Sequence, residues 1–100
     1  MLPPNRRPTP PGEILRHEFL EPLRLNQKEL AAALGITRVR LSEILRGKRA
    51  ITPDTALRLS RYFDTTPEFW LGLQTDVNLW DTLQAHGSEY EKIKPVKSAA

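Results

Sequence analysis

Residues 26–49 read NQKELAAALGITRVRLSEILRGKR, and the fold follows from this stretch. Asn26 is a favourable N-cap, so a helix is expected to begin directly after it. Gly35 is expected to end that helix, because glycine readily adopts the left-handed conformation that closes many helices. Between them, apolar residues recur at the spacing of one helical face: Leu30, Ala31 and Leu34. This part of the sequence predicts a short helix with one buried face.

A second short helix is predicted directly after the first. Thr37 can cap its start, and Gly47 is placed to end it. The side chains expected to face inward are Leu41, Ile44 and Leu45. Two short helices joined by a turn that contains glycine form a helix-turn-helix, here over Gln27 to Arg46. The second helix of such a motif enters the major groove of DNA.

The flanking segments predict three further helices. Each begins where a threonine precedes proline, an arrangement that suits the first turn of a helix, and the predicted ranges are 11–22, 53–63 and 67–84. Gly87 lies just beyond the last of them. No segment alternates apolar and polar residues as a strand would. The sequence therefore predicts an all-α fold of five helices, with the helix-turn-helix at its centre.

One folded domain is expected over residues 11–87, because 100 residues leave no room for a second. Residues 1–10 are expected to form a flexible arm, and residues 88–100 a frayed tail. The start lacks the apolar core of a signal peptide, and no run of about 18 apolar residues occurs. Cysteine is absent. We therefore expect a cytoplasmic protein without disulfides and without a membrane partner.

The positive charge is concentrated in the helix-turn-helix segment. Residues 26–49 hold six basic and two acidic side chains, a net charge of +4, whereas the whole chain carries +3. A cluster of charge is by itself often only a solvated surface. At this position, however, it matches the charge that a DNA-binding face requires.

The second helix of the motif and its flanks present side chains suited to DNA. Arginine can bind the O6 and N7 atoms of guanine, so Arg38 and Arg40 are the preferred base contacts, and Glu43 can accept from cytosine N4. Removing Arg40 is expected to relax specificity at one base pair. Gln27 begins the first helix, where free N–H groups and a side-chain amide can hold a phosphate. The complete expected DNA-binding set is Gln27, Thr37, Arg38, Arg40, Ser42, Glu43, Arg46, Lys48 and Arg49.

The last helix carries more apolar surface than one face requires. One expected face holds Trp70, Leu73, Val77 and Trp80, and a neighbouring face is extended by Phe69, Leu79 and Leu83. One face can complete the core, and the other can join two copies into a two-fold dimer, which we assign to the first set. A dimer would place two recognition helices about 34 Å apart, at successive major grooves of a palindromic operator. The alternative is that all these side chains belong to the core.

Several short motifs resemble those of known proteins. The helix-turn-helix resembles the large repressor-like (XRE) family through QKELA at 27–31, GIT at 35–37 and SEIL at 42–45. A narrower resemblance, to the HigA antitoxins, also called virulence-associated protein I-like, is carried by PGEIL at 11–15, GKR at 47–49 and TPEFWL at 66–71. Arg46 stands where asparagine is common in that family. The resemblance implies a repressor-like domain that neutralises a small RelE-like ribonuclease toxin, HigB, encoded beside it, and that represses their shared operon as a dimer.

Other functions remain to be weighed against this one. A stand-alone transcriptional regulator without a toxin partner is the main alternative, and a protein-interaction module on the same fold is a third. An enzyme is not expected: HEFLE at 17–21 lacks the second histidine of the zinc-protease motif, and His86 is isolated. We expect no metal and no cofactor.

Overall fold

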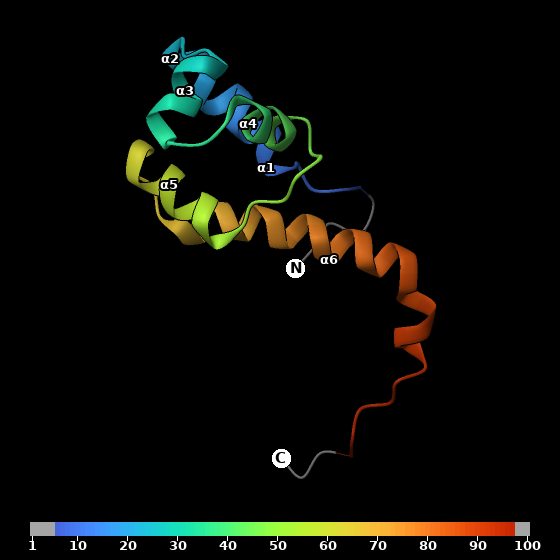
Figure 1. Cartoon of the computed structure of the whole chain (residues 1–100). Helices are drawn as coiled ribbons and strands as arrows, with labels where there is room; N and C mark the ends of the chain where they lie inside the picture. The colour runs from blue at the N-terminus through green and yellow to red at the C-terminus, as the bar shows by residue number, and fades with distance from the viewer. Residues whose placement is uncertain (1–5, 98–100) are drawn as a thin grey trace.

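The computed structural model describes residues 6–97, which form helices joined by short turns and contain no strand (Figure 1). The first helical run is continuous and consists of α1 (Pro11–Ile14), the π-helical segment η1 (Leu15–Leu20) and α2 (Glu21–Leu23). It is followed by α3 (Gln27–Leu34), α4 (Arg38–Leu45), α5 (Pro53–Phe63) and α6 (Pro67–Glu91). Counted as one helix, the first run makes five helices in all within this range, which confirms the predicted all-α fold.

Side-chain caps start the helices of the central motif where the sequence predicts them. The Asn26 side chain accepts from the Glu29 amide at 2.7 Å, and the Glu29 carboxylate accepts from the Asn26 amide at 3.0 Å, a complete capping box. Thr37 accepts from the Arg40 amide at 3.0 Å. Gly35 and Gly47 both have left-handed backbone angles, with φ of 71° and 73°. Local chemistry therefore sets the boundaries of α3 and α4.

The first helix contains a wide turn that the sequence analysis did not predict. Pro22 lies near its end, and in a regular α-helix the proline ring would collide with the carbonyl group of Glu18. The π-helical segment η1 directly precedes it and widens the turn at that point. The helix thus continues past Pro22 to Leu23, and Arg24 ends it with a left-handed φ of 56°.

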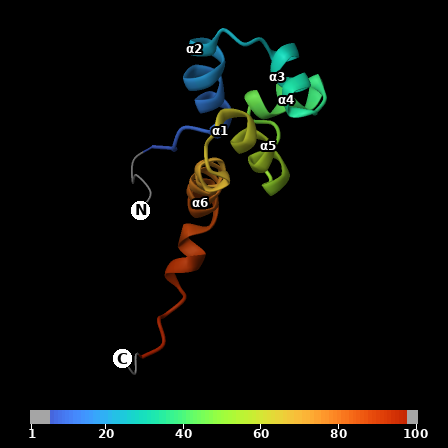
Figure 2. The same ribbon diagram turned by 90° about the vertical axis from the view of Figure 1, so that its left-hand side faces the viewer.

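The core lies where α1 to α5 meet the first half of α6 (Figure 2). Trp70 of α6 is fully buried, and its indole N–H donates to the Thr65 hydroxyl at 2.8 Å. Phe19 and Phe63 pack against that indole ring. The other large side chains that are almost completely buried are Leu15, Leu30, Leu41, Ile44 and Leu59. The helix-turn-helix thus rests on a core that its own inward face helps to form.

Helix α6 is longer than predicted and projects from the globular part (Figures 1 and 2). It extends through Gly87 to Glu91, so the expected end near Gln84 is wrong and residues 88–91 are helical. Gly87 does not adopt a left-handed angle, and the first residue that excludes a helix is Pro95. The part of the predicted tail at residues 98–100 lies outside the described residues. None of the helices in residues 6–97 is both long and apolar enough to cross a membrane.

The described part of the N-terminal arm contacts α6 through an ion pair. The Arg7 guanidinium group donates two hydrogen bonds to the Asp81 carboxylate, at 2.8 and 3.0 Å. These bonds lower the pKa of Asp81 and raise the pKa of Arg7. This two-point ion pair joins Arg7 to α6, and the flexible arm over residues 1–10 stays a prediction. The rest of that arm, residues 1–5, lies outside the described residues.

Candidate nucleic-acid interface

Helices α3 and α4 form the predicted helix-turn-helix. They contact one another, and the turn between them is closed by the Ile36 amide, which donates to the Ala31 carbonyl group at 3.0 Å. The turn requires a positive φ at residue 35, and glycine adopts such an angle without strain because it has no Cβ atom. Ala31, only 1% exposed, is small enough for the two helices to approach closely. The arrangement leaves one long side of α4 uncovered.

The uncovered side of α4 carries several of the predicted DNA-binding residues. Arg38 and Arg46 are exposed, and Ser42 and Glu43 are half-buried along the same side. Thr37, at the start of the helix, is exposed and uses its hydroxyl oxygen as the N-cap. Leu41, Ile44 and Leu45 are buried on the opposite side, as predicted. The structure therefore brings a row of polar side chains to one accessible face.

Arg40, the other predicted base contact, is bound to α5 in this structure. Its Nη2 atom donates to the Asp54 carboxylate at 2.8 Å and to the Thr55 hydroxyl at 2.7 Å, so the side chain lies against α5. Only 25% of this side chain is exposed. Both of these bonds would have to break before the guanidinium group could enter a groove, so the base contact of Arg40 stays a prediction that this geometry does not favour.

Glu43 and Arg49 are also paired with one another. Arg49 Nη2 lies 2.7 Å from the Glu43 carboxylate, and its Nε donates to the same oxygen at 2.9 Å. Both bonds are accepted by Oε1, so Oε2 keeps its capacity to accept, and the expected contact of Glu43 with cytosine stays a prediction. The pair also places the Arg49 charge beside the exposed side of α4.

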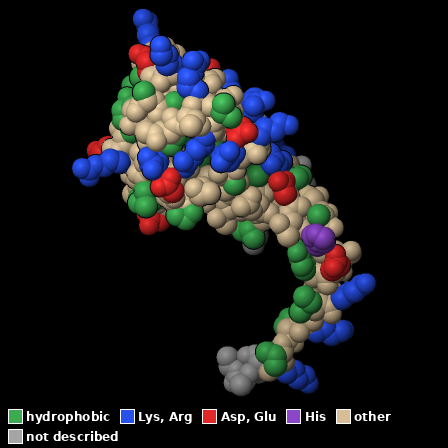
Figure 3. Space-filling model, viewed as in Figure 1, with side chains coloured by type: hydrophobic (Ala, Val, Ile, Leu, Met, Phe, Trp, Pro, Cys, Tyr) green, Lys and Arg blue, Asp and Glu red, His purple; other side chains and the backbone are tan. Residues whose placement is uncertain are grey.

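The remaining predicted residues lie around the two ends of the motif. Gln27 is half-buried in the first turn of α3, and Lys48 is exposed in the segment that follows α4. Figure 3 shows Lys and Arg side chains gathered over the globular part of the molecule, which holds these helices. Positive side chains therefore border the motif, as phosphate contacts require.

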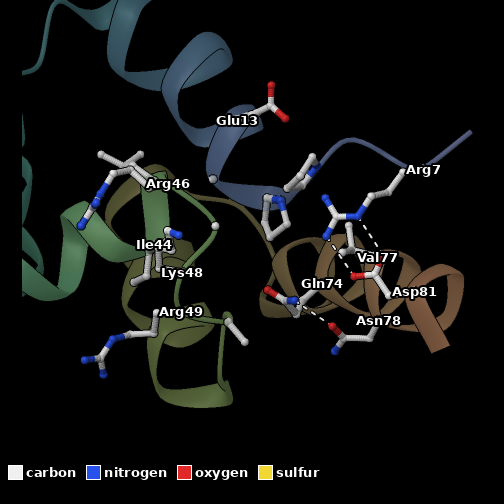
Figure 4. Close-up of a pocket in the computed structure, with 16 residues that line it drawn as sticks. Arg7, Glu13, Ile44, Arg46, Lys48, Arg49, Gln74, Val77, Asn78 and Asp81 are labelled. Atoms are coloured by element: carbon white, nitrogen blue, oxygen red, sulfur yellow. Dashed lines mark hydrogen bonds and ion pairs between the residues drawn. The ribbon is translucent and has the colours of Figure 1, made fainter. Parts of the chain in front are cut away.

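A cavity of about 490 Å³ lies behind this surface, between the start of α1, the segment after α4 and the middle of α6. Arg7, Lys48 and Gln74 are among its lining residues, and Arg46 and Arg49 point away from the Arg7–Asp81 pair (Figure 4). The Gln74 side chain accepts from the Ile51 amide at 2.8 Å. This contact ties the segment after α4 to α6.

The predicted dimer residues on α6 lie mostly inside the chain. Trp70 is completely buried and Val77 is 4% exposed, so neither offers surface to a second copy, which corrects that assignment. Leu73 and Trp80 are half-buried. The apolar side chains that α6 does expose in its middle are Leu79 and Leu83, at 54% and 49%.

Val39 is a candidate site residue that the sequence analysis left out. It lies between Arg38 and Arg40 on α4, and 67% of it is exposed. The available signal was its position one residue after Arg38 on the outward side of a recognition helix. A valine there can contact the methyl group of thymine, so Val39 is added to the candidate base contacts.

Comparisons with known proteins find the same motif. The family model described as Helix-turn-helix matches residues 17–70 of this chain. An uncharacterized HTH-type transcriptional regulator of Haemophilus influenzae is 51% identical over 76 residues, which cover 76% of this chain and 71% of that protein. Antitoxin HigA-1 of Vibrio cholerae serotype O1 is 41% identical over 91 residues, covering 91% of this chain and 86% of the antitoxin.

A solved structure is similar to this chain over most of the length of both. It is the Pseudomonas aeruginosa antitoxin HigA with the higBA promoter, and it superposes with a TM-score of 0.85 at 41% identity. The match covers 90% of this chain and 99% of that one. This similarity extends well beyond the two helices of the motif and includes most of α6.

Proposed function

This chain belongs to the helix-turn-helix family and is a relative of the HigA antitoxins within it, and from this premise we propose that it is a DNA-binding antitoxin that represses its own operon. The observation that carries the proposal is the uncovered side of α4. Arg38 and Val39 project there, on a helix whose opposite side is buried in the core. Arg38 has no ion pair or hydrogen bond through its side chain within residues 6–97, so it is free to bind guanine.

We assign the phosphate contacts to residues at the two ends of the motif. Gln27 lies at the N-terminus of α3, where backbone N–H groups and the positive end of the helix dipole favour an anion. Lys48 and Arg49 follow α4 and supply positive charge. These contacts position the domain on the duplex, and they do not select a sequence.

We propose that two copies associate through the exposed apolar side chains of α6. Leu79 and Leu83 are separated by one helical turn and therefore lie on one face. A two-fold dimer through this face would present two α4 helices to a palindromic operator.

The toxin partner follows from the family. A relative of HigA antitoxins is expected to bind a small RelE-like ribonuclease encoded beside it, in the cytoplasm. No catalytic residue forms part of this proposal, since the chain would act by occupying DNA and by holding its partner.

The test is a pull-down of the tagged full chain from its own host, followed by mass spectrometry. Recovery of a stoichiometric small protein encoded next to this gene, which arrests growth when it is expressed alone, would support the antitoxin assignment. The Arg38→Ala variant is the matched control: it should lose promoter DNA and keep the partner, since Arg38 is assigned to DNA alone.

A stand-alone transcriptional regulator is the second candidate. It is favoured by the similarity to the Haemophilus influenzae protein, which is named as a transcriptional regulator and not as an antitoxin. A chain that is recovered alone, as a dimer that binds promoter DNA, would establish this alternative.

A further inference from the structure

We propose that Arg40 is a positioning residue of the DNA interface, which binds Asp54 and Thr55 to hold α4 in its orientation and does not contact a base. The inference rests on the proposed function, because it concerns the same DNA-binding face. It assigns a role in DNA binding to two residues of α5 that the sequence analysis did not include.

Arg40 connects α4 to the first turn of α5. One nitrogen, Nη2, reaches both the Asp54 carboxylate and the Thr55 hydroxyl. Thr55 is only 2% exposed, and it is the one buried polar side chain among the described residues. Because Thr55 is buried, its surroundings hold the hydroxyl group in one position. The bond to that group therefore fixes the position of the Arg40 side chain, and with it this side of α4.

Asp54 extends this connection to α3. Its Oδ2 atom also accepts from Arg58 Nε at 2.9 Å. Arg58 in turn donates through Nη1 to the carbonyl groups of Leu34 and Gly35, at 2.9 and 3.4 Å. These are carbonyl groups at the end of α3, which the helix itself leaves without partners. Asp54 therefore lies between two arginines, one from α4 and one that holds the end of α3.

This arrangement is suited to fixing the orientation of α4. The helix has only eight residues, and its apolar contacts are confined to one side. Apolar contacts are not directional, so by themselves they permit the helix to roll or tilt slightly. The polar connection joins α4, at Arg40, to the first turn of α5, where it opposes such a movement. Each exposed ion pair contributes little to overall stability, so its loss should leave the domain folded.

Whether replacing Asp54 strengthens or weakens DNA binding distinguishes a positioning role from a purely electrostatic effect. Asp54 is a negative charge near a surface that binds phosphates, so replacing it with a neutral residue should by charge alone strengthen DNA binding. If Asp54 positions α4 through Arg40, the same replacement should weaken binding. The two explanations therefore predict opposite changes for Asp54→Asn.

The experiment measures binding of the full chain to a duplex that spans the promoter of its own gene and to single-base variants of that duplex. The proteins are the wild type, Arg40→Ala, Asp54→Asn and the double variant, with Asp76→Asn on the exposed surface of α6 as a charge-matched control. Arg40→Ala and Asp54→Asn should each weaken binding about 3- to 30-fold, similarly for every base variant. The double variant should lose no more than Arg40→Ala alone, because both changes break one connection. Asp76→Asn should bind as the wild type does.

Two further measurements keep the test decisive. Thr55→Val removes the buried hydroxyl group without changing charge or shape, and it should weaken binding in the same uniform way. Amide hydrogen exchange along α4 should be faster in Asp54→Asn than in Asp76→Asn, whether or not DNA is present. Tighter binding by Asp54→Asn, a loss confined to one base pair in Arg40→Ala, or unchanged exchange along α4 would each overturn the proposal. A wild type that binds no duplex would instead defeat the proposed function, and the exchange comparison would still test the positioning role.

Discussion

Gly12 of α1 lies directly against the backbone of Ile44 in α4, so closely that a methyl group at residue 12 would overlap the Ile44 carbonyl oxygen. The carbonyl oxygen and the Cα atom of Leu45 would lie only 2.9 and 3.0 Å from the same methyl group. All three atoms belong to the backbone, which cannot rotate out of the way as a side chain can. The first helix thus meets the recognition helix through a contact that requires glycine.

Gly12→Ala should destabilise the protein because α1 and α4 would have to move apart. We expect a loss of about 1–3 kcal/mol in the free energy of unfolding, the usual effect of overfilling a close contact. Urea denaturation followed by circular dichroism measures it. Gly72→Ala is the matched control, because Gly72 is helical and has open space around its Cβ position. That change should stabilise by about 0.5–1 kcal/mol, and a similar loss in both variants would contradict the steric explanation.

The face of α4 should divide into residues that select sequence and residues that do not. Arg38→Ala should cost about 1–3 kcal/mol on the operator and relax the preference at one base pair. Val39→Ala should reduce discrimination only where thymine is preferred, since its methyl groups are the contact. Affinities for a set of operators with single-base substitutions measure both effects.

Lys48→Ala should behave differently from these two variants. It should weaken all sequences alike and reduce the slope of log affinity against log salt concentration by about one, because one phosphate contact is lost. Titrations of operator and random duplexes over a range of salt concentrations measure this slope. If Lys48→Ala changed base preference, or if Arg38→Ala weakened random DNA as much as the operator, the division would be wrong.

The α6 face should determine the oligomeric state. A charge placed at Leu83, as in Leu83→Glu, should convert the dimer to a monomer, because an unpaired carboxylate would be buried between two apolar surfaces. Sedimentation velocity at micromolar concentration measures the mass. Leu57→Glu is the control, since Leu57 of α5 is 57% exposed but lies on another helix. A wild type that sediments as a single chain would remove the dimer from the proposal.

Local chemistry explains why the motif could be predicted from the sequence. Asn26 and Thr37 cap helices through bonds to residues three positions away, and such bonds depend on nothing outside the segment. Gly35 was identifiable for the same reason. The end of α6 could not be predicted in this way, because Gly87 suits either a helix end or a helix interior and the choice depends on its surroundings.

The role of Arg40 depended on tertiary structure. Its partner Asp54 is fourteen residues away and on another helix, so only the position of α5 determines that the two side chains meet. The same is true of Trp70 and Val77, since a helix with two apolar faces does not reveal which one its own chain covers. The sequence predicted the types of residue that an interface needs. Which of these side chains are exposed, and which are buried or bound within the chain, depends on how the helices pack.

The ion pair between Arg7 and Asp81 should make the position of the N-terminal arm sensitive to acid. Hydrogen bonds from Arg7 lower the pKa of Asp81 below the usual value of an aspartate, about 3.9. A carboxylate with a lowered folded-state pKa stabilises the fold above its unfolded pKa, and this contribution is lost as the pH falls through the folded value. The pair should therefore persist at neutral pH and break only below about pH 4.

NMR titration of the Asp81 carboxyl carbon measures this pKa, and Arg7→Ala should raise it toward the ordinary value. Arg6→Ala, which removes the neighbouring exposed charge, is the control and should leave the Asp81 titration almost unchanged. An Asp81 pKa that is the same in the wild type and in Arg7→Ala would mean that the arm is not held to α6 in solution.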